Sequence, residues 1–228
     1  NSNRRRRCEI YWEQSKLVCI LMPGFRKAGM IVLSSPSGAG KTTLVKKISK
    51  NRNYSISISH TTRLPRPNEK NGKDYFFISK NNFKKLIKKK EFLEHAKVFD
   101  NYYGSSKKLV IDKLKKGQNI VFDIDWQGTR QIRNKRLNYK LLTIFILPPS
   151  KAELLKRLKK REKKNMKTVR KRMKEFKKDM LKWKEYDHVV INDDLNNCYK
   201  KIMRVIKTSS EITTDLPFIK NHVKKLLN

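Results

Sequence analysis

The 228-residue sequence has few of the features that mark secreted or membrane proteins. Its three cysteines, Cys8, Cys19 and Cys198, are scattered and form no C-x-x-C pair, which excludes a disulfide framework and offers no zinc spacing. The longest apolar runs fall well short of the about 20 residues that a membrane-spanning helix needs. We therefore expect a protein of a reducing compartment, the cytoplasm, with no membrane partner.

Acidic residues are also scarce, since 20 Asp and Glu stand against 57 Lys and Arg and give a formal charge of +37. Such an excess raises nucleic acid as a partner. The lysines, however, are spread along the chain among many Asn and Ile, and no aromatic platform for single strands accompanies them. We attribute much of the charge to compositional bias and keep nucleic acid as a secondary expectation.

The first 29 residues differ in composition from the rest of the chain. They contain four arginines at 4–7, two acidic residues and a short apolar stretch at 17–22. That stretch is too short for a secretory signal, and the acidic residues argue against a transit peptide. We expect residues 1–29 to be a disordered or spurious extension, with Met22 or Met30 as the true start.

Glycine is sparse, with 8 residues in the chain, and Gly38 and Gly40 stand close together in a stretch that we call the phosphate loop, residues 34–43. An apolar run precedes this loop and a segment of helical pattern follows it. Glycines let the backbone aim several N–H groups at one anion, and a helix N-terminus adds its positive dipole end. The order of strand, loop and helix predicts a site for a nucleoside triphosphate.

The positions of the phosphate loop have separate expected roles. Lys41 would reach the β- and γ-phosphates, and the hydroxyl of Thr42 has the position that ligates Mg²⁺ in such loops. The other loop residues predicted to hold ATP are Ser37, Gly38, Ala39, Gly40 and Thr43. Ser35 stands where the pattern usually has its first glycine, and we expect it to be tolerated if its φ stays negative. A Gly/Ser turn without a ligand is the alternative.

Buried strands are predicted from apolar, β-branched runs at 30–33, 120–124, 141–147 and 189–191. Because such strands alternate with lysine-rich segments of helical spacing, we predict an α/β fold with a doubly wound parallel sheet. The pattern from Ser150 to Glu153 matches a capping box at the start of a helix. Residues 59–106 break this rhythm with turn formers and aromatics, and we predict that they form an inserted subdomain.

Two arginines of this insert, Arg63 and Arg66, lie three residues apart and are stiffened by neighbouring prolines, with Tyr75 nine residues further on. A fixed pair of guanidinium groups suits a second phosphate, which it would hold by charge-assisted hydrogen bonds. A solvated basic loop is the alternative. The sequence therefore favours a second anion site in addition to the phosphate loop.

Ordered motifs between Met30 and about Lys207 resemble the guanylate kinase family, in particular its bacterial members. They are S-P-S-G-A-G-K-T, S-H-T-T-R-x-P-R-P, N-G-K-D-Y-F-F, F-L-E-H-A, Y-Y-G-S, D-I-D-W-Q-G, P-P-S and V-I-N-D-D. The resemblance implies a guanylate kinase-like domain at 30–208, divided into a P-loop core (30–58, 107–149 and 186–208), a GMP-binding insert (59–106) and a helical lid (150–185). A C-terminal helical tail at 209–228 would follow.

The same resemblance implies an ATP:GMP phosphotransferase that uses Mg²⁺ and makes ADP and GDP from ATP and GMP, with dGMP as a second acceptor. Purine nucleotide metabolism and GMP recycling are the implied setting, and the enzyme would be a monomer or a homodimer. The alternative is a catalytically inactive module of the same fold that binds a phosphopeptide or nucleic acid.

By resemblance, Arg63, Arg66, Tyr75 and Tyr103 hold the GMP phosphate, and Ser59, Glu94 and Ser105 read the guanine. A carboxylate suits this base, because guanine offers both its N1–H and its 2-amino group whereas adenine has an acceptor at N1. The predicted substrate-binding set is completed by Gly104, Asp123 and Asp125. The two aspartates follow an apolar strand, where such a residue contacts either the metal shell or the substrate, and the sequence does not divide these roles between them. Capping of the following helix is the alternative for Asp125.

The lid would supply Arg161 and Arg172 to the phosphates of ATP, and with Lys41 and Arg66 they form the predicted catalytic set. Arg157 and Arg170 are rival candidates because several basic residues share this segment. Asn192 and Asp193 would line the adenosine side by resemblance, with a simple turn at the end of a strand as the alternative.

Overall fold

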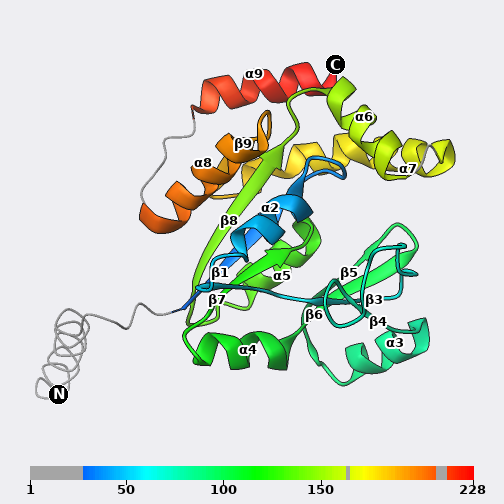
Figure 1. Ribbon diagram of the computed structural model, residues 1–228, viewed down its shortest axis with the longest axis vertical. Coiled ribbons are helices and arrows are strands. Elements are labelled where there is room, and N and C mark those ends of the chain that lie inside the picture. Colours follow the sequence, from blue (N-terminus) through cyan, green and yellow to red (C-terminus); the bar gives the residue numbers. More distant parts are fainter. Residues whose placement is uncertain (1–27, 163–164, 209–214) are drawn as a thin grey trace, which may run out of the picture.

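The computed structural model describes residues 28–162, 165–208 and 215–228. The extension expected at 1–29 therefore lies outside the described residues, apart from Ala28 and Gly29. A five-stranded sheet and a four-stranded sheet lie next to each other, with helices around both (Figure 1). Among the described residues, no helix is both long and apolar enough to cross a membrane.

The five-stranded sheet is parallel throughout, in the order β2-β7-β1-β8-β9. Its strands are β1 (Gly29–Ser34), β2 (Tyr54–Ile56), β7 (Asn119–Asp123), β8 (Lys140–Leu147) and β9 (His188–Ile191). Four of them cover the apolar runs that predicted buried strands, so the α/β class and the parallel sheet are confirmed. β1 begins at Gly29, which the sequence analysis had assigned to the extension.

Side chains of β1 alternate between the two faces of this sheet, as a strand requires. Ile31 and Leu33 belong to one buried apolar cluster, whereas Met30 and Val32 belong to the other. The first cluster is covered by α2 (Lys41–Ile48), α6 (Lys151–Arg161), α7 (Met166–Met180), α8 (Leu195–Thr208) and α9 (Leu216–Leu227). The second is covered by α4 (Lys107–Lys115) and α5 (Trp126–Asn134). The sheet is therefore buried on both faces, as the doubly wound prediction requires.

The four-stranded sheet has the order β4-β3-β6-β5 and is formed by residues 59–106. It contains β3 (Ser59–Thr61), β4 (Phe76–Phe77), β5 (Phe92–Val98) and β6 (Asn101–Ser106), and α3 (Lys80–Lys88) packs against it. The rings of Phe83 and Phe92 stack at 4.5 Å between centroids. This aromatic packing gives the segment an apolar centre apart from the two clusters of the main sheet.

The segment from α6 through α7 to the 3-10 helix η1 (Leu181–Glu185) extends beyond the main sheet, above the four-stranded sheet in Figure 1. α6 begins as predicted, because the Ser150 side chain accepts a hydrogen bond from the backbone N–H of Glu153 at 3.1 Å. The tip of the β5–β6 hairpin reaches α7, where the Arg172 guanidinium lies 4.9 Å from the centre of the Phe99 ring. Asp100 at the same tip forms an ion pair with Lys171.

Candidate functional site

The phosphate loop runs from the end of β1 to the start of α2. Gly38 and Gly40 have φ of 95° and 96°, a conformation that side chains disfavour, and a Cβ at Gly40 would collide with the Asn192 amide. Among the described residues, no side chain caps α2 at its N-terminus. The first N–H groups of α2 are therefore open to an anion, which the helix dipole also favours.

Ser35 replaces the usual first glycine without backbone strain. It is not one of the described non-glycine residues with positive φ, which are Lys90, Phe99 and Arg136. Its hydroxyl donates a hydrogen bond to the carbonyl of Pro36 at 2.9 Å. The condition under which the sequence analysis expected serine to be tolerated is met.

Lys41 and Thr42 meet Asp123, the last residue of β7. Lys41 Nζ lies 2.8 Å from one oxygen of this carboxylate and donates to the carbonyl of Ile124 at 2.8 Å, while Thr42 donates to the other carboxylate oxygen at 2.7 Å. Burial alone would raise the pKa of Asp123, but the charge of Lys41 and the hydrogen bonds from Lys41 and Thr42 lower it. Asp123 is therefore ionised beside the phosphate loop.

The pair of Thr42 and Asp123 fits a magnesium ion. Mg²⁺ prefers hard oxygen ligands, and it is usually held by one or two carboxylates together with the phosphates of a nucleotide. Within the described ranges there is no group of three or more His, Cys, Asp or Glu residues that could hold a metal by itself. A metal here would therefore depend on the nucleotide for the rest of its ligands.

Asn192 holds the phosphate loop through a hydrogen bond to its backbone. Its side-chain N–H group donates to the carbonyl of Ala39 at 2.7 Å, and its backbone N–H continues the β8–β9 ladder to the carbonyl of Leu147 at 2.8 Å. Asp193 is exposed and accepts from the backbone N–H of Asp194, as in a turn at the end of a strand. The structure thus gives Asn192 a role in holding the loop, and it places Asp193 in the turn that the sequence analysis kept as the alternative.

Arg161 and Arg172 converge on the phosphate loop. Their guanidinium groups donate to the Ser37 hydroxyl at 3.0 and 2.8 Å, respectively. The rival Arg157 instead pairs with Glu153 at 2.9 Å and reaches the carbonyl of Asn192, and Arg170 is exposed. Of the basic residues considered for the lid, the predicted pair donates to Ser37, while Arg157 also lies beside the loop, with Nη1 4.0 Å from where a Cβ at Gly40 would be.

Glu162 is the carboxylate among these arginines. Its Oε1 lies 3.0 Å from Arg161 Nε, 3.2 Å from Arg172 Nε and 3.8 Å from Arg66 Nη2. Burial and the neighbouring charge of Arg161 lower the pKa of Arg172 to about 10. The three arginines carry more positive charge than the single carboxylate of Glu162 neutralises, and bound phosphate groups would neutralise the rest.

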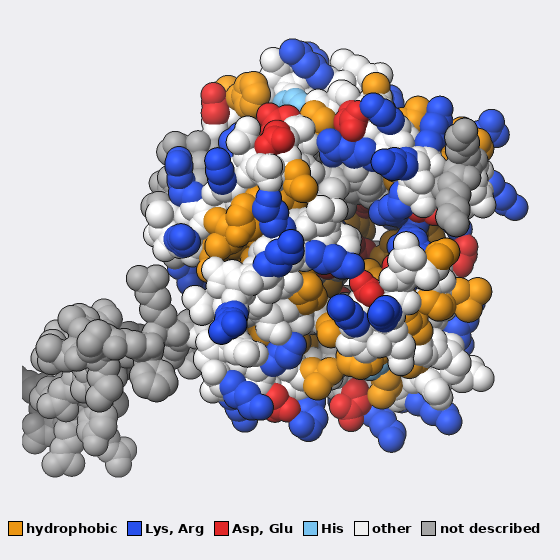
Figure 2. Space-filling model, in the orientation of Figure 1, with side chains coloured by type: hydrophobic (Ala, Val, Ile, Leu, Met, Phe, Trp, Pro, Cys, Tyr) orange, Lys and Arg blue, Asp and Glu red, His pale blue; other side chains and the backbone are white. Residues whose placement is uncertain are grey.

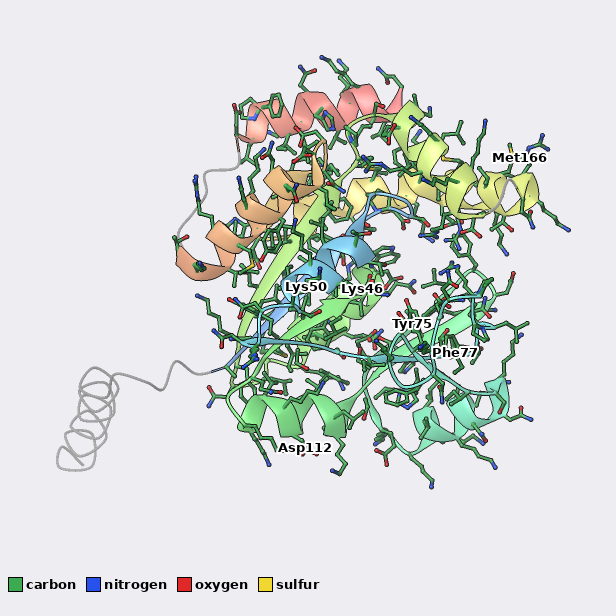
Figure 3. All side chains as sticks on the ribbon, in the orientation of Figure 1. Lys46, Lys50, Tyr75, Phe77, Asp112 and Met166 are labelled. Carbon is green, nitrogen blue, oxygen red and sulfur yellow. The ribbon has the colours of Figure 1, made fainter. Side chains whose placement is uncertain are left out.

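The arginine pair of the insert is held by Glu69, which the sequence analysis did not single out. Arg63 Nη2 donates to both oxygens of Glu69 at 2.9 and 2.8 Å, and Arg66 Nη1 donates at 3.2 Å. The Arg63 guanidinium also lies 5.4 Å from the ring centre of Tyr75, which is 6.1 Å from the ring of Tyr103. The four residues predicted to hold a phosphate are thus assembled in one place, and Figure 3 labels Tyr75 on the side of the insert nearest α2.

Glu94 is buried between the insert and α5, with 2% of its surface exposed. Ser105 donates a hydrogen bond to its Oε1 at 2.6 Å, and Ser105 is the register partner of Ser59 across β3 and β6. A Cβ on Gly128 in α5 would collide with the other oxygen of Glu94. Burial raises the pKa of Glu94 to about 7, so this carboxyl group titrates near neutral pH.

Gly104 is next to Ser105 in β6, and a Cβ there would lie 3.0 Å from the Phe92 ring and 3.1 Å from the carbonyl of Glu94. The absence of a side chain lets β5 and β6 pack closely at this point. Gly104 therefore shapes the surroundings of Glu94 through packing.

Asp125 is the N-cap of α5, the alternative that the sequence analysis left open. Its Oδ1 accepts hydrogen bonds from the backbone N–H groups of Gln127 and Gly128, each at 3.0 Å, and its Oδ2 accepts from the Gln127 side chain at 2.9 Å. The cap fixes the start of α5 next to Glu94. Thr43, another predicted residue, is exposed in the first turn of α2.

The two anion sites face one hollow. Figure 2 shows it between the α6–α7 segment and the four-stranded sheet, with Lys and Arg side chains around its rim. Arg66, from the insert, and Arg161 and Arg172, from the α6–α7 segment, approach the same carboxylate of Glu162. This arrangement can hold two phosphorylated ligands with their phosphates close together, one over the phosphate loop and one at the arginine pair.

Comparisons with known proteins agree on one family. The family model described as guanylate kinase matches residues 27–209. A guanylate kinase of Ruegeria pomeroyi is 42% identical over 202 residues, which cover 88% of this chain and 95% of that protein. One of Rickettsia bellii is 45% identical over 181 residues, covering 79% of this chain and 94% of the relative. The crystal structure of guanylate kinase from Anaplasma phagocytophilum has a TM-score of 0.68 at 30% identity, covering 88% of this chain and 95% of that one.

Proposed function

The chain belongs to the guanylate kinase family, and we propose on this basis that it transfers the γ-phosphate of ATP to GMP, giving ADP and GDP. One observation carries the choice of GMP: the insert holds a buried carboxyl, Glu94, which accepts a hydrogen bond from Ser105 and lies against Gly128 of α5. The contacts proposed for Glu94 and Ser105 are to the base and do not involve the sugar, so we include dGMP as an acceptor.

Base selection follows from the donors and acceptors of this pair. An ionised Glu94 accepts from guanine N1–H and the 2-amino group together, and the hydroxyl of Ser59 can donate to O6. Ser105 donates to Glu94 in the structure, so it would donate to O6 only by turning its hydroxyl away from that carboxylate. Adenine presents an acceptor at N1 and a donor in place of O6, which would leave buried polar groups unpaired. A site of this kind rejects the wrong base by a factor on the order of 10⁴.

Phosphoryl transfer is mainly a matter of position and charge, because the attacking phosphate oxygen of GMP is already an anion. The proposed arrangement has Lys41 and the N–H groups of α2 on the phosphates of ATP, and Arg63, Arg66, Tyr75 and Tyr103 on the phosphate of GMP. Arg161 and Arg172 would neutralise the charge on the transferred group, and closure of residues 150–185 would keep water from it.

Magnesium belongs to the same proposal. Thr42 and Asp123 would hold it, as their paired oxygens fit this ion. When bound, Mg²⁺ neutralises charge on the β- and γ-phosphates. In the structure Lys41 pairs with Asp123, and its positive charge favours the ionised form of that carboxylate.

The wider setting remains part of the proposal. We place the enzyme in the cytoplasm, where ATP and GMP are metabolised, in purine nucleotide metabolism and GMP recycling, as a monomer or a homodimer. Residues 59–106 are proposed as the GMP-binding insert and 150–185 as the lid. Nucleic acid stays a secondary partner of the basic surface, and binding to it would weaken steeply with salt.

The alternative of an inactive guanylate kinase-like module is not favoured. A module that only binds has no need for a lysine on the phosphate loop or for two lid arginines that reach Ser37. The chain also matches guanylate kinases over nearly their whole length.

The experiment is Mg²⁺-dependent release of ADP from ATP with GMP, dGMP, AMP, CMP, UMP and dTMP offered in parallel, and Lys41→Ala as the blank. We expect turnover with GMP and dGMP only, and none in the blank. No turnover with any acceptor would refute the enzymatic function and direct the work to phosphopeptide and nucleic-acid binding.

A further inference from the structure

One carboxylate outside the predicted site organises both arginines of the insert. The oxygens of Glu69 receive the two hydrogen bonds from Arg63 Nη2, one from Arg66 Nη1 and one from the backbone N–H of Arg66 at 2.8 Å. In return, the backbone N–H of Glu69 donates to the carbonyl of Arg66 at 2.9 Å. Side chain and backbone of Glu69 thus fix the loop and both guanidinium groups together.

The ion pair of Arg63 and Glu69 is largely buried. The side chains of Arg63 and Glu69 are 14% and 16% exposed, so neither is a freely solvated surface charge. Burial alone would raise the pKa of Glu69, but the hydrogen bonds from the Arg66 backbone and from Arg63 lower it. Glu69 is therefore a carboxylate throughout the neutral pH range, and its bonds to the arginines are charge-assisted, the strong kind of hydrogen bond.

Two opposite effects on a bound phosphate have to be compared. The negative charge of Glu69 repels a phosphate, yet without it two guanidinium groups would face each other in a half-buried loop and repel. Arg63, Arg66 and Glu69 together keep one net positive charge, so the group still attracts an anion. We expect the orienting effect of Glu69 to outweigh its repulsion of the phosphate, because a planar guanidinium that is already oriented loses less conformational freedom when it binds.

We propose that Glu69 is a positioning residue for the phosphate of the acceptor nucleotide, holding Arg63 and Arg66 as a preformed pair. This rests on the proposed function, in which that pair binds GMP. Glu69 itself does not touch the nucleotide, because its oxygens are directed at the arginines. Its contribution is confined to the phosphate and does not extend to the guanine, which Glu94 reads from β5.

The test compares GMP with guanosine, which has the same base and sugar and no phosphate. Calorimetric dissociation constants are measured for both ligands with the wild-type chain, Glu69→Gln and Glu69→Asp. Glu91→Gln is the matched control, because Glu91 is an exposed acid of the same insert and loses the same charge. For Glu69→Gln we expect GMP affinity to fall by about tenfold or more, guanosine affinity to stay within about twofold, and the control to match the wild type.

Steady-state kinetics tests the same point: in Glu69→Gln the KM for GMP should rise while the KM for ATP does not. Glu69→Asp keeps the carboxylate and should recover part of the loss, and it decides the question if thermal melting shows that Glu69→Gln is unfolded. Unchanged or tighter GMP binding, or an equal loss for GMP and guanosine, would overturn the inference. A wild-type chain that prefers GMP to guanosine but shows no turnover would refute the proposed enzyme and leave this comparison intact.

Discussion

Affinity for the guanine base should depend on pH through Glu94. This carboxyl has a pKa of about 7 in the folded protein, against an ordinary value of 4.5, because it is buried. Only the ionised form offers acceptors to both guanine N1–H and the 2-amino group, whereas the protonated form turns a hydroxyl toward one of these donors. Binding therefore favours loss of the proton, and affinity should fall as the pH falls through 7.

The size of the effect follows from the pKa. At pH 8 about nine tenths of the Glu94 side chains are ionised, and at pH 6 about one tenth. If only the ionised form binds, guanosine binds about tenfold more weakly at pH 6 than at pH 8, and each bound molecule releases about one proton at pH 6. Guanosine is the right probe because it lacks the phosphate, whose own titration would add to that of GMP.

The assay is titration calorimetry with guanosine from pH 5.5 to 8.5, in buffers of different ionisation enthalpy so that released protons are counted. Glu94→Gln is the control, because its amide is isosteric and does not titrate. The pH dependence and the proton release should both disappear in this variant. Wild-type affinity that is flat across this range, or equal proton release in both proteins, would refute the reasoning.

Three further predictions concern stability and turnover. The raised pKa of Glu94 means that the folded state favours the protonated form, so the contribution of this residue to stability is full below about pH 4.5 and is lost as the pH rises through 7. At pH 8 the free energy of unfolding in urea should therefore be up to about 3 kcal/mol higher for Glu94→Gln than for the wild type. A difference that does not shrink toward pH 5 contradicts this. Gly40→Ala should cost about 1–3 kcal/mol and raise the KM for ATP, whereas Gly117→Ala, with φ of 78° and open space around it, should leave that KM unchanged. Arg172→Lys should lower kcat by about 10³ while the exposed Arg170→Lys keeps it, and equal rates for the two would remove Arg172 from the catalytic set.

Much of the fold could be predicted because its signals are local. Strands buried on both faces need continuous apolar runs, and the phosphate loop needs glycines where φ is positive, so both leave a pattern in the sequence. The arginine pair was also visible, through the prolines beside it. These features depend on residues that are neighbours in the chain.

Contacts between distant or unremarkable residues could not be predicted. In the sequence Glu69 and Glu162 look like ordinary surface acids, each followed by a lysine, and only the fold shows that arginines surround them. Arg157 and Arg161 lie one helical turn apart, so spacing does not say which of them reaches Ser37. An acid before a helix, such as Asp125, has the same appearance in a sequence whether it caps the helix or binds a ligand.

The contact between the β5–β6 hairpin and α7 has a thermodynamic consequence. Phe99 and Asp100 lie at the tip of the hairpin, and their partners Arg172 and Lys171 lie in α7. If residues 150–185 close as a lid, as proposed, that movement changes the surroundings of the hairpin. Linkage requires that the factor by which GMP changes the affinity for ATP equals the factor by which ATP changes the affinity for GMP. Each nucleotide would thus change the affinity for the other through the contacts of Phe99, Asp100 and Arg66 with the α6–α7 segment.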